Sequence, residues 1–233
     1  MTADGTTPEP AGNSGRISDP AAFIRSETKI KTVPHAEEIR LHLADEAMSL
    51  WLKTEDELGE LGLPPPFWAF AWAGGQGLAR YILDHPASVI GKSVMDFASG
   101  SGLVGIAAMM AGARSCICAD IDPFAEIAGR LNADLNQVTL IHTRTDVLDG
   151  PPPNVDLVFS GDVFYDKPMA ERVLAFLDRA RCNGSDVLIG DPGRSYLPKN
   201  RLQELASYSV PIVGALEDSE IKKTSIFRLQ PRQ

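Results

Sequence analysis

A strand, a turn of small residues and a helix follow one another over residues 93–113. The strand carries one acid, Asp96, near its end, and residues 98–102 are all Ala, Ser or Gly. A second apolar stretch, 115–119, ends at Asp120. A glycine turn between a strand and a helix, with an acid after the next strand, is typical of a nucleotide-type cofactor site in an α/β sheet.

The same turn also satisfies the dinucleotide pattern G-x-G-x-x-G, over residues 100–105. In dinucleotide sites the backbone amides receive a pyrophosphate, and Asp96 would place a carboxylate against those phosphates at an electrostatic cost. S-adenosylmethionine instead carries an ammonium and a sulfonium. We therefore expect Asp96 to serve its methionine end, with Gly100 and Gly102 allowing close approach. Asp120 would accept hydrogen bonds from the ribose hydroxyls, and an NAD-dependent oxidoreductase remains an alternative.

Strand-like and helix-like segments continue to alternate along the chain. The expected strands cover residues 140–143, 155–160, 186–190 and 225–229, and the expected helices cover 77–85, 123–136 and 169–180. This alternation predicts one doubly wound, mostly parallel α/β sheet with right-handed crossovers.

Aspartates fall at or just after the ends of successive expected strands: Asp96, Asp120, Asp146, Asp162 and Asp191. Ligands of such sheets bind beyond the carboxyl ends of the strands. A single aspartate after a strand is common in turns, but five at one edge of a sheet predict a ligand-binding site.

The chain divides into three expected parts. Residues 1–18 are rich in Thr, Pro and Gly and predict a disordered tail. Residues 19–63 predict an amino-terminal extension that packs on the core, with a helix at 21–27 and a half-exposed strand at 38–43. Residues 64–233 form the expected catalytic domain.

Charge and composition narrow the class of partner. With 31 acidic and 22 basic residues, the net charge of -9 does not favour nucleic acid. The three cysteines and four histidines show no metal-ligand spacing, so no metal is expected. No stretch reaches the length of a membrane span. A cytoplasmic monomer is the expectation.

Five segments carry a family resemblance: PPPFWAFAWAGGQGLARYILDHP at 64–86, VMDFASGSG at 94–102, DIDP at 120–123, GDVFYD at 161–166 and LIGDPGR at 188–194. Together they resemble the class I, seven-stranded, Rossmann-like methyltransferases. More narrowly, they resemble the electron transfer flavoprotein β-subunit lysine methyltransferases, over about residues 35 to 230.

The resemblance implies a protein-lysine N-methyltransferase that uses S-adenosylmethionine, with the electron transfer flavoprotein β-subunit as its partner and substrate. It implies that Asp162 and Tyr165 lie at the methyl-transfer site. The expected cofactor-binding residues are Trp72, Asp96, Ala98, Ser99, Gly100, Gly102, Asp120, Asp146, Val147 and Gly161. Trp72 would border the cofactor, and Asp146 and Val147 would lie near the adenine. Ala98 stands where the family motif usually has glycine.

Asp162 would orient the incoming ammonium, and Phe164 and Tyr165 would form an apolar wall that favours the neutral amine. From the residues alone, Asp162 and Tyr165 equally suit a loop that leads into the next helix. Most tryptophans fill a core, but the glycine pair at 74–75 favours a ligand site beside Trp72. Arg194 would lie near the crevice, where it could contact a protein substrate.

Other functions remain open on the sequence. The methyl acceptor could be another protein, such as a ribosomal protein, or a small amine. A non-catalytic cofactor-binding assembly partner is a further alternative from a different functional class.

Overall fold

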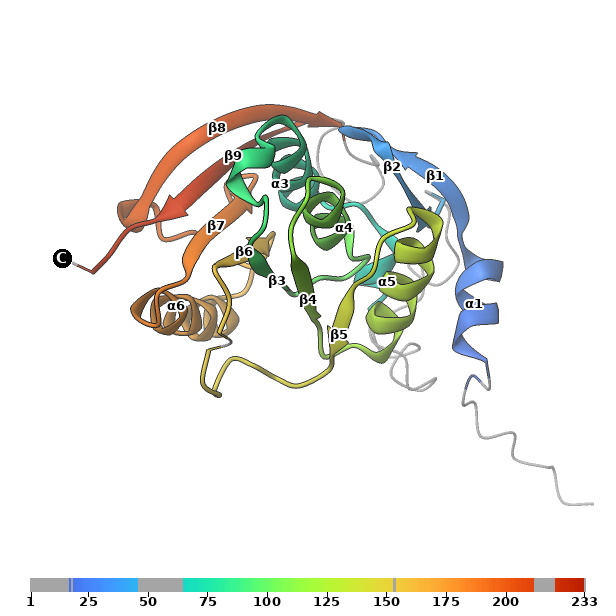
Figure 1. The fold of residues 1–233 in the computed structure, drawn as a ribbon, viewed down its shortest axis with the longest axis horizontal. Helices are drawn as coiled ribbons and strands as arrows, with labels where there is room; N and C mark the ends of the chain where they lie inside the picture. The colour runs from blue at the N-terminus through green and yellow to red at the C-terminus, as the bar shows by residue number, and fades with distance from the viewer. Residues whose placement is uncertain (1–16, 18, 46–64, 153, 212–220, 233) are drawn as a thin grey trace, which may run out of the picture.

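A single seven-stranded sheet organises the protein (Figure 1). The computed structural model describes residues 17, 19–45, 65–152, 154–211 and 221–232. The strand order is β5-β4-β3-β6-β7-β9-β8. The strands are β3 (Ser93–Phe97), β4 (Ser115–Ala119), β5 (Ile141–Thr143), β6 (Leu157–Gly161), β7 (Asp186–Asp191), β8 (Leu202–Pro211) and β9 (Ile221–Leu229). Neighbours from β5 to β7 pair in parallel, whereas β9 pairs antiparallel with both β7 and β8.

Helices cover both faces of this sheet, as the sequence predicts. They are α3 (Ala73–Asp84), α4 (Leu103–Met110), α5 (Pro123–Leu135) and α6 (Lys167–Cys182). Alternate strand residues separate the two faces: Val94 and Phe159 pack with α3 and α4, whereas Met95 and Val158 pack with α6. Figure 1 shows α6 on the side opposite α3. The sheet is therefore doubly wound, and its core lies in two layers.

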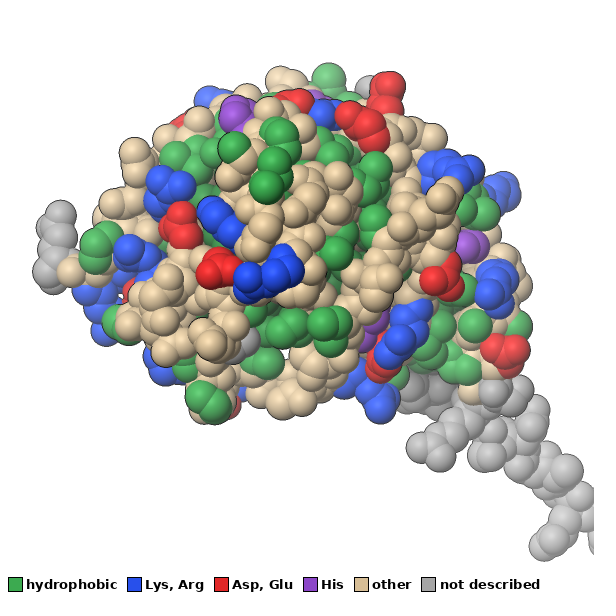
Figure 2. All heavy atoms as spheres, in the orientation of Figure 1, with side chains coloured by type: hydrophobic (Ala, Val, Ile, Leu, Met, Phe, Trp, Pro, Cys, Tyr) green, Lys and Arg blue, Asp and Glu red, His purple; other side chains and the backbone are tan. Residues whose placement is uncertain are grey.

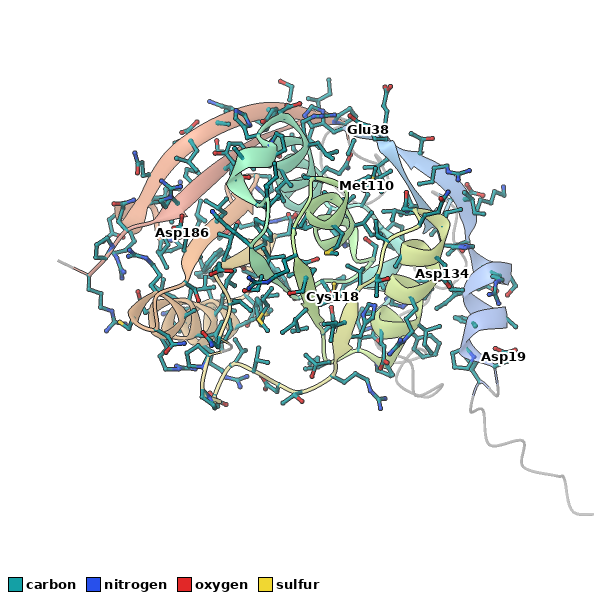
Figure 3. The ribbon with its side chains drawn as sticks, in the orientation of Figure 1. Asp19, Glu38, Met110, Cys118, Asp134 and Asp186 are labelled. Atoms are coloured by element: carbon teal, nitrogen blue, oxygen red, sulfur yellow. The ribbon has the colours of Figure 1, made fainter. Side chains whose placement is uncertain are left out.

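The amino-terminal residues form a helix and a two-stranded ribbon. Helix α1 (Pro20–Glu27) begins after Asp19, which is labelled in Figure 3. Its Oδ1 accepts a hydrogen bond from Ala22 N at 3.0 Å. Strands β1 (Lys29–Val33) and β2 (Ala36–Leu43) pair antiparallel. Apolar residues of β2 join the core on the α4 side of the sheet. These contacts place residues 19–45 against the sheet domain.

Two asparagines of α5 bind the backbone of β2. Asn132 Oδ1 accepts from His42 N at 2.8 Å, and Asn136 Oδ1 accepts from Arg40 N at 3.0 Å. The fully buried Asn132 also donates from Nδ2 to Ser101 O at 2.8 Å. One side chain thus joins the ribbon to the glycine turn after β3.

Most expected elements are confirmed with small shifts at their ends, and one expectation needs correction. Helix α3 begins at Ala73 rather than at residue 77, so the glycine pair at 74–75 lies inside its first turn. Strands β1 and β8 were not anticipated. The expected tail at 1–18 and the second half of the extension, 46–63, lie almost wholly outside the described residues.

Basic and acidic side chains are interspersed on the face shown in Figure 2. No helix in the described part of the chain is long and apolar enough to cross a membrane. Among the described residues, no three His, Cys, Asp or Glu side chains are grouped so as to hold a metal ion.

Candidate active site

The glycine turn after β3 has a left-handed backbone at three positions. Ala98, Gly100 and Gly102 have φ of 53°, 49° and 79°. Positive φ is easy for glycine and costs an alanine energy, so Ala98 is strained. The turn ends at Gly102, the residue before α4. It lies against the 3-10 turn Phe67–Ala69, because a Cβ on Gly100 would lie 3.8 Å from Trp68 Cα.

Asp96 lies beneath this turn and is buried. Its Oδ2 accepts a hydrogen bond from Gly105 N in α4 at 3.0 Å. Burial raises the pKa of Asp96 to about 8, because the one backbone hydrogen bond only partly offsets desolvation. Asp96 therefore holds the first turn of α4 against β3.

Asp120 follows β4 and binds the turn directly. Its Oδ2 accepts from Gly100 N at 2.8 Å, and its Oδ1 accepts from Asp122 N at 3.0 Å. Burial raises the pKa of Asp120, although these backbone hydrogen bonds oppose the shift. The structure thus brings Asp96, Asp120 and the glycine turn together at the carboxyl ends of adjacent strands, as the sequence predicts.

Asp162 follows β6 and lies beneath the first turn of α3. Its φ of 57° is left-handed, which is uncommon for a residue with a side chain. Oδ2 accepts from Gly74 N and, at 3.3 Å, from Gly75 N. Oδ1 forms an ion pair with Arg194, whose Nη2 lies at 2.7 Å and whose Nε lies at 3.2 Å. Asp162 therefore joins the helix α3, the end of β6 and the loop after β7.

Glycines make this arrangement possible. A Cβ on Gly74 would collide with Gly190 O, and one on Gly190 would collide with Gly74 O. A Cβ on Gly161 would lie 3.1 Å from Gly75 N. The glycine pair therefore serves close packing of α3 on β6 and β7. The expectation that it makes room for a ligand beside Trp72 is wrong for Gly74, which is buried.

Aromatic side chains border the site. Phe67 and Trp72 meet edge to face with ring centroids 5.8 Å apart, and Trp72 Nε1 donates to Phe67 O at 3.0 Å. Phe67 also lies 6.3 Å from the ring of Tyr165. Phe67 and Tyr165 are 42% and 50% exposed. Phe164 is fully buried in the core with α6, so the expectation that it forms a wall of the site is wrong.

Asp191, at the end of β7, is buried and positions Arg194. Its Oδ1 accepts from Gly193 N and Arg194 N, both at 2.7 Å, whereas Oδ2 is buried with no hydrogen-bond partner among the described residues. Burial raises the pKa of Asp191 to about 6, and the charge of Asp162 adds to the shift. The predicted turn at 191–193 therefore directs Arg194 to Asp162.

Asp146 and Val147 follow β5. Asp146 is exposed, accepts from Leu148 N at 3.0 Å and pairs with Arg172 Nη2 at 3.0 Å. Val147 packs against the core on the α6 side. Nothing in these contacts joins either residue to the glycine turn, so their predicted place near an adenine stays a prediction.

Two contributors were not singled out from the sequence. Phe67 lies within the segment 64–72, and the aromatic composition of that segment is the sequence feature that could have identified it as a site residue. Asn132 could not be singled out from the sequence, since it is one polar residue in an amphipathic helix.

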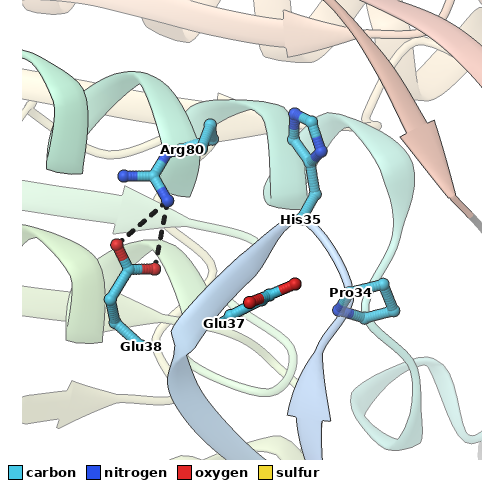
Figure 4. Close-up of a pocket in the computed structure, with 5 residues that line it drawn as sticks. All are labelled: Pro34, His35, Glu37, Glu38 and Arg80. Atoms are coloured by element: carbon cyan, nitrogen blue, oxygen red, sulfur yellow. Dashed lines mark hydrogen bonds and ion pairs between the residues drawn. The ribbon is translucent and has the colours of Figure 1, made fainter.

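Figure 4 shows a separate pocket lined by Pro34, His35, Glu37, Glu38 and Arg80, where Glu38 pairs with Arg80 at 3.0 Å. None of its lining residues follows a strand of the large sheet.

Solved structures and a sequence profile agree on the fold. A Pyrococcus horikoshii protein provisionally described as an RNA methyltransferase has a TM-score of 0.55 at 16% identity, over 72% of this chain and 89% of that one. Trm5b from Pyrococcus abyssi has a TM-score of 0.52 at 15% identity, over 88% and 56%. The profile of the ribosomal protein L11 methyltransferase (PrmA) family matches residues 82–161.

Closer relatives match nearly the whole chain. The electron transfer flavoprotein β-subunit lysine methyltransferase of Xenopus laevis is 36% identical over 91% of this chain and 87% of its own length. The Homo sapiens protein of the same name is 34% identical over 95% and 87%. With this similarity and the seven-stranded fold, the chain is a methyltransferase that belongs to the electron transfer flavoprotein β-subunit lysine methyltransferase family.

Proposed function

We propose that this protein transfers methyl groups from S-adenosylmethionine to lysine side chains of the electron transfer flavoprotein β-subunit. The observation that carries the proposal is the position of the GDVFYD segment. Its Asp162 and Tyr165 lie at the carboxyl end of β6, next to the strand that bears the glycine turn. The names of the relatives supply the acceptor.

The residues at the turn fit S-adenosylmethionine. Among the described residues, the atoms within 4 Å of a Cβ built on Gly100 are both backbone atoms, Trp68 Cα at 3.8 Å and Phe67 O at 3.9 Å, so no described side chain crowds this position. Asp120 carries lone pairs beyond its two backbone hydrogen bonds and suits ribose hydroxyls. When bound, the cofactor supplies an electrophilic methyl group on a sulfonium.

The remaining cofactor contacts belong to this proposal as well. Trp72 would border the cofactor, and Ala98, Ser99 and Gly102 would contact it through the turn. Gly161, Asp146 and Val147 are assigned by resemblance. Asp96 lies beneath the glycine turn and does not contact the cofactor directly in this proposal, because its buried carboxyl already binds Gly105 N. Its effect on the methionine end is therefore exerted mainly through the shape of the turn.

The protein's main contribution to transfer is alignment of the lysine nitrogen. That nitrogen would first lose its ammonium proton to water, and its lone pair would then form the bond to the methyl carbon as the carbon–sulfur bond breaks and leaves its electron pair on sulfur. The exposed rings of Phe67 and Tyr165 offer an apolar border that favours the neutral amine by desolvation. Holding the amine in line with the breaking bond supplies most of the rate gain.

Asp162 suits orientation and charge stabilisation better than proton abstraction. Two backbone amides at a helix N-terminus and an arginine already donate to its carboxylate. These donors occupy both carboxylate oxygens and fix the orientation of the side chain. Asp162 therefore attracts the lysine ammonium before its deprotonation and does not itself remove the proton.

The test is a labelling experiment with radiolabelled S-adenosylmethionine and an extract supplemented with recombinant electron transfer flavoprotein. The expected result is one labelled band at the mass of the β-subunit. Asp162→Ala and Asp162→Asn should lose this band and still bind the cofactor. Asp178→Asn is the matched control, since Asp178 also pairs with an arginine, Arg201 at 2.7 Å, in a different part of the fold.

Other bands would assign other functions. The PrmA profile gives a ribosomal protein as the second candidate acceptor, although its match covers only residues 82–161. Label on a ribosomal protein or a small amine would replace the proposed acceptor. Cofactor binding with no label in any extract would support a non-catalytic assembly partner.

A further inference from the structure

Arg194 covers the carboxylate that an acceptor lysine has to reach. With the guanidinium in place, Asp162 is 9% exposed. Its Oδ2 faces the amides of α3, and its Oδ1 receives both Nε and Nη2 of Arg194. The side chain of Arg194 is the more exposed partner, at 21% against 10%. Arg194 is thus the more exposed partner, and it covers the Oδ1 side of the Asp162 carboxylate.

We propose that Arg194 is a specificity-determining residue that occupies the ammonium site at Asp162 Oδ1 until a protein-borne lysine displaces it. This inference rests on the proposed lysine methylation. A guanidinium and a lysine ammonium are both cations with N–H donors, and the same carboxylate oxygen suits both. Two hydrogen bonds to one guanidinium hold better than a single ammonium contact. A free amine therefore competes poorly with Arg194.

A lysine on a protein surface has a source of binding energy that a free amine lacks. Contacts remote from the reacting group can drive such a displacement, because binding energy made elsewhere on a substrate offsets an unfavourable rearrangement at the site. Exposed apolar side chains stand after strands at this edge of the sheet: Ile121, Tyr165 and Tyr196. They provide surface for those remote contacts.

The displaced guanidinium has an acceptor nearby. Asp191 is 1% exposed, and its Oδ2 has no hydrogen-bond partner among the described residues. Arg194 N already donates to Oδ1 of the same carboxylate at 2.7 Å, which keeps the arginine backbone beside it. The charges of Asp162 and Arg194 both act on the titration of Asp191. Asp191 therefore offers Arg194 a second position.

The test compares two acceptors, the electron transfer flavoprotein and N-acetyl-lysine methylamide, with the wild type and Arg194→Gln. We expect Arg194→Gln to raise kcat/KM for the small acceptor at least tenfold, mainly through KM, with a smaller change for the protein. In Asp162→Asn/Arg194→Gln that gain should vanish. Arg194→Lys keeps a positive charge, so its kcat/KM for the small acceptor should lie between the values of the wild type and Arg194→Gln. It also serves as the test variant if Arg194→Gln folds poorly.

Arg201→Gln is the matched control. Arg201 pairs with Asp178 in α6 at 2.7 Å with similar exposure, 15% and 13%, and it contacts no residue of the site. The Arg201→Gln variant should have a lower unfolding temperature, with no change in the ratio of kcat/KM between the two acceptors. An unchanged ratio in Arg194→Gln, or an equal loss on both acceptors, would overturn the proposal.

A binding measurement separates this inference from the proposed function. Binding of n-butylammonium to the protein, followed by NMR in the presence of S-adenosylhomocysteine, requires no methyl transfer. Arg194→Gln should bind it at least tenfold more tightly than the wild type, and the double variant should not. If no acceptor is labelled, the proposed function fails, and this titration still decides whether Arg194 occupies a cation site.

Discussion

Gly74 and Gly190 lie backbone to backbone, so closely that neither position has room for a Cβ. Gly74 belongs to the first turn of α3 and Gly190 to β7. The contact brings the free amides of that turn to Asp162. A structural requirement for two glycines is thus what positions the carboxylate assigned to the acceptor lysine.

Replacing Gly190 with alanine should destabilise the protein. Because the added methyl would collide with a backbone carbonyl, we expect the free energy of unfolding to fall by about 2–3 kcal/mol. Urea denaturation measures the change. Gly75→Ala is the neighbouring control: its Cβ would lie 3.9 Å from Leu103 Cδ2, and a helix prefers alanine. A loss in Gly75→Ala as large as that in Gly190→Ala would contradict the packing argument.

Ala98→Gly should stabilise the protein. Ala98 has a φ of 53°, a region that costs residues with a Cβ about 1–2 kcal/mol. Glycine relieves this strain and loses more chain entropy on folding, so we expect a net gain of about 0.5–1 kcal/mol. Thermal and urea unfolding would measure it. Ala108→Gly, in α4, should show the opposite sign.

Asp96 should make the stability fall as pH rises. Its folded-state pKa is raised to about 8, so the folded protein holds a proton that the unfolded chain releases near pH 4. The stabilisation is complete below the unfolded pKa and disappears as pH rises towards 8. Asp96→Asn stays neutral, so its stability relative to the wild type should increase by at least about 2 kcal/mol between pH 5 and pH 8.

The control for this pH dependence is an acid with the opposite shift. Ion pairs with Arg201 and Arg232 lower the pKa of Asp178 against the opposing effect of burial. Its stabilisation is present above the unfolded pKa and disappears as pH falls. Urea denaturation at three pH values should therefore show that Asp178→Asn is less stable than the wild type at neutral pH, and that this difference in free energy of unfolding shrinks as the pH falls. A parallel trend in the two variants would contradict the assignment of Asp96.

The ring of Tyr165 should matter more than its hydroxyl. Tyr165 is half exposed and lies beside Phe67, where the ring can border the acceptor amine. Desolvation raises the pKa of Tyr165, so its hydroxyl stays protonated at neutral pH. We expect Tyr165→Phe to keep kcat/KM within about threefold and Tyr165→Ala to lose more than tenfold, since apolar contact is what the ring supplies. Equal losses would assign the role to the hydroxyl.

The sequence predicted the structure best in two kinds of segment: strands that are buried on both faces, and turns whose backbone requires a positive φ. The turn from Asp96 to Gly102 combines both properties, and the structure places it as expected. The start of α5 at Pro123 was also predicted correctly, because proline is well placed in the first turn of a helix. Local chemistry alone fixes these features.

What escaped the sequence depends on contacts between distant residues. Strand β8 lies at the edge of the sheet and carries many polar residues, so its apolar signal is weak. Phe164 and Tyr165 are adjacent in a loop, and only the packed α6 determines that the first is buried and the second exposed. The pairing of Asp162 with Arg194 likewise requires β6 and β7 to be neighbours.

The buried carboxamide of Asn132 has a consequence for how this protein can change over time. It binds β2 through His42 N and the glycine turn through Ser101 O, so two distant segments share one side chain. A substitution that moves either segment leaves a buried polar group unsatisfied, at a cost of about 1–3 kcal/mol. Exchanging or deleting the amino-terminal ribbon is therefore expected to destabilise the part of the chain that holds the glycine turn, so we expect the two segments to diverge together across relatives.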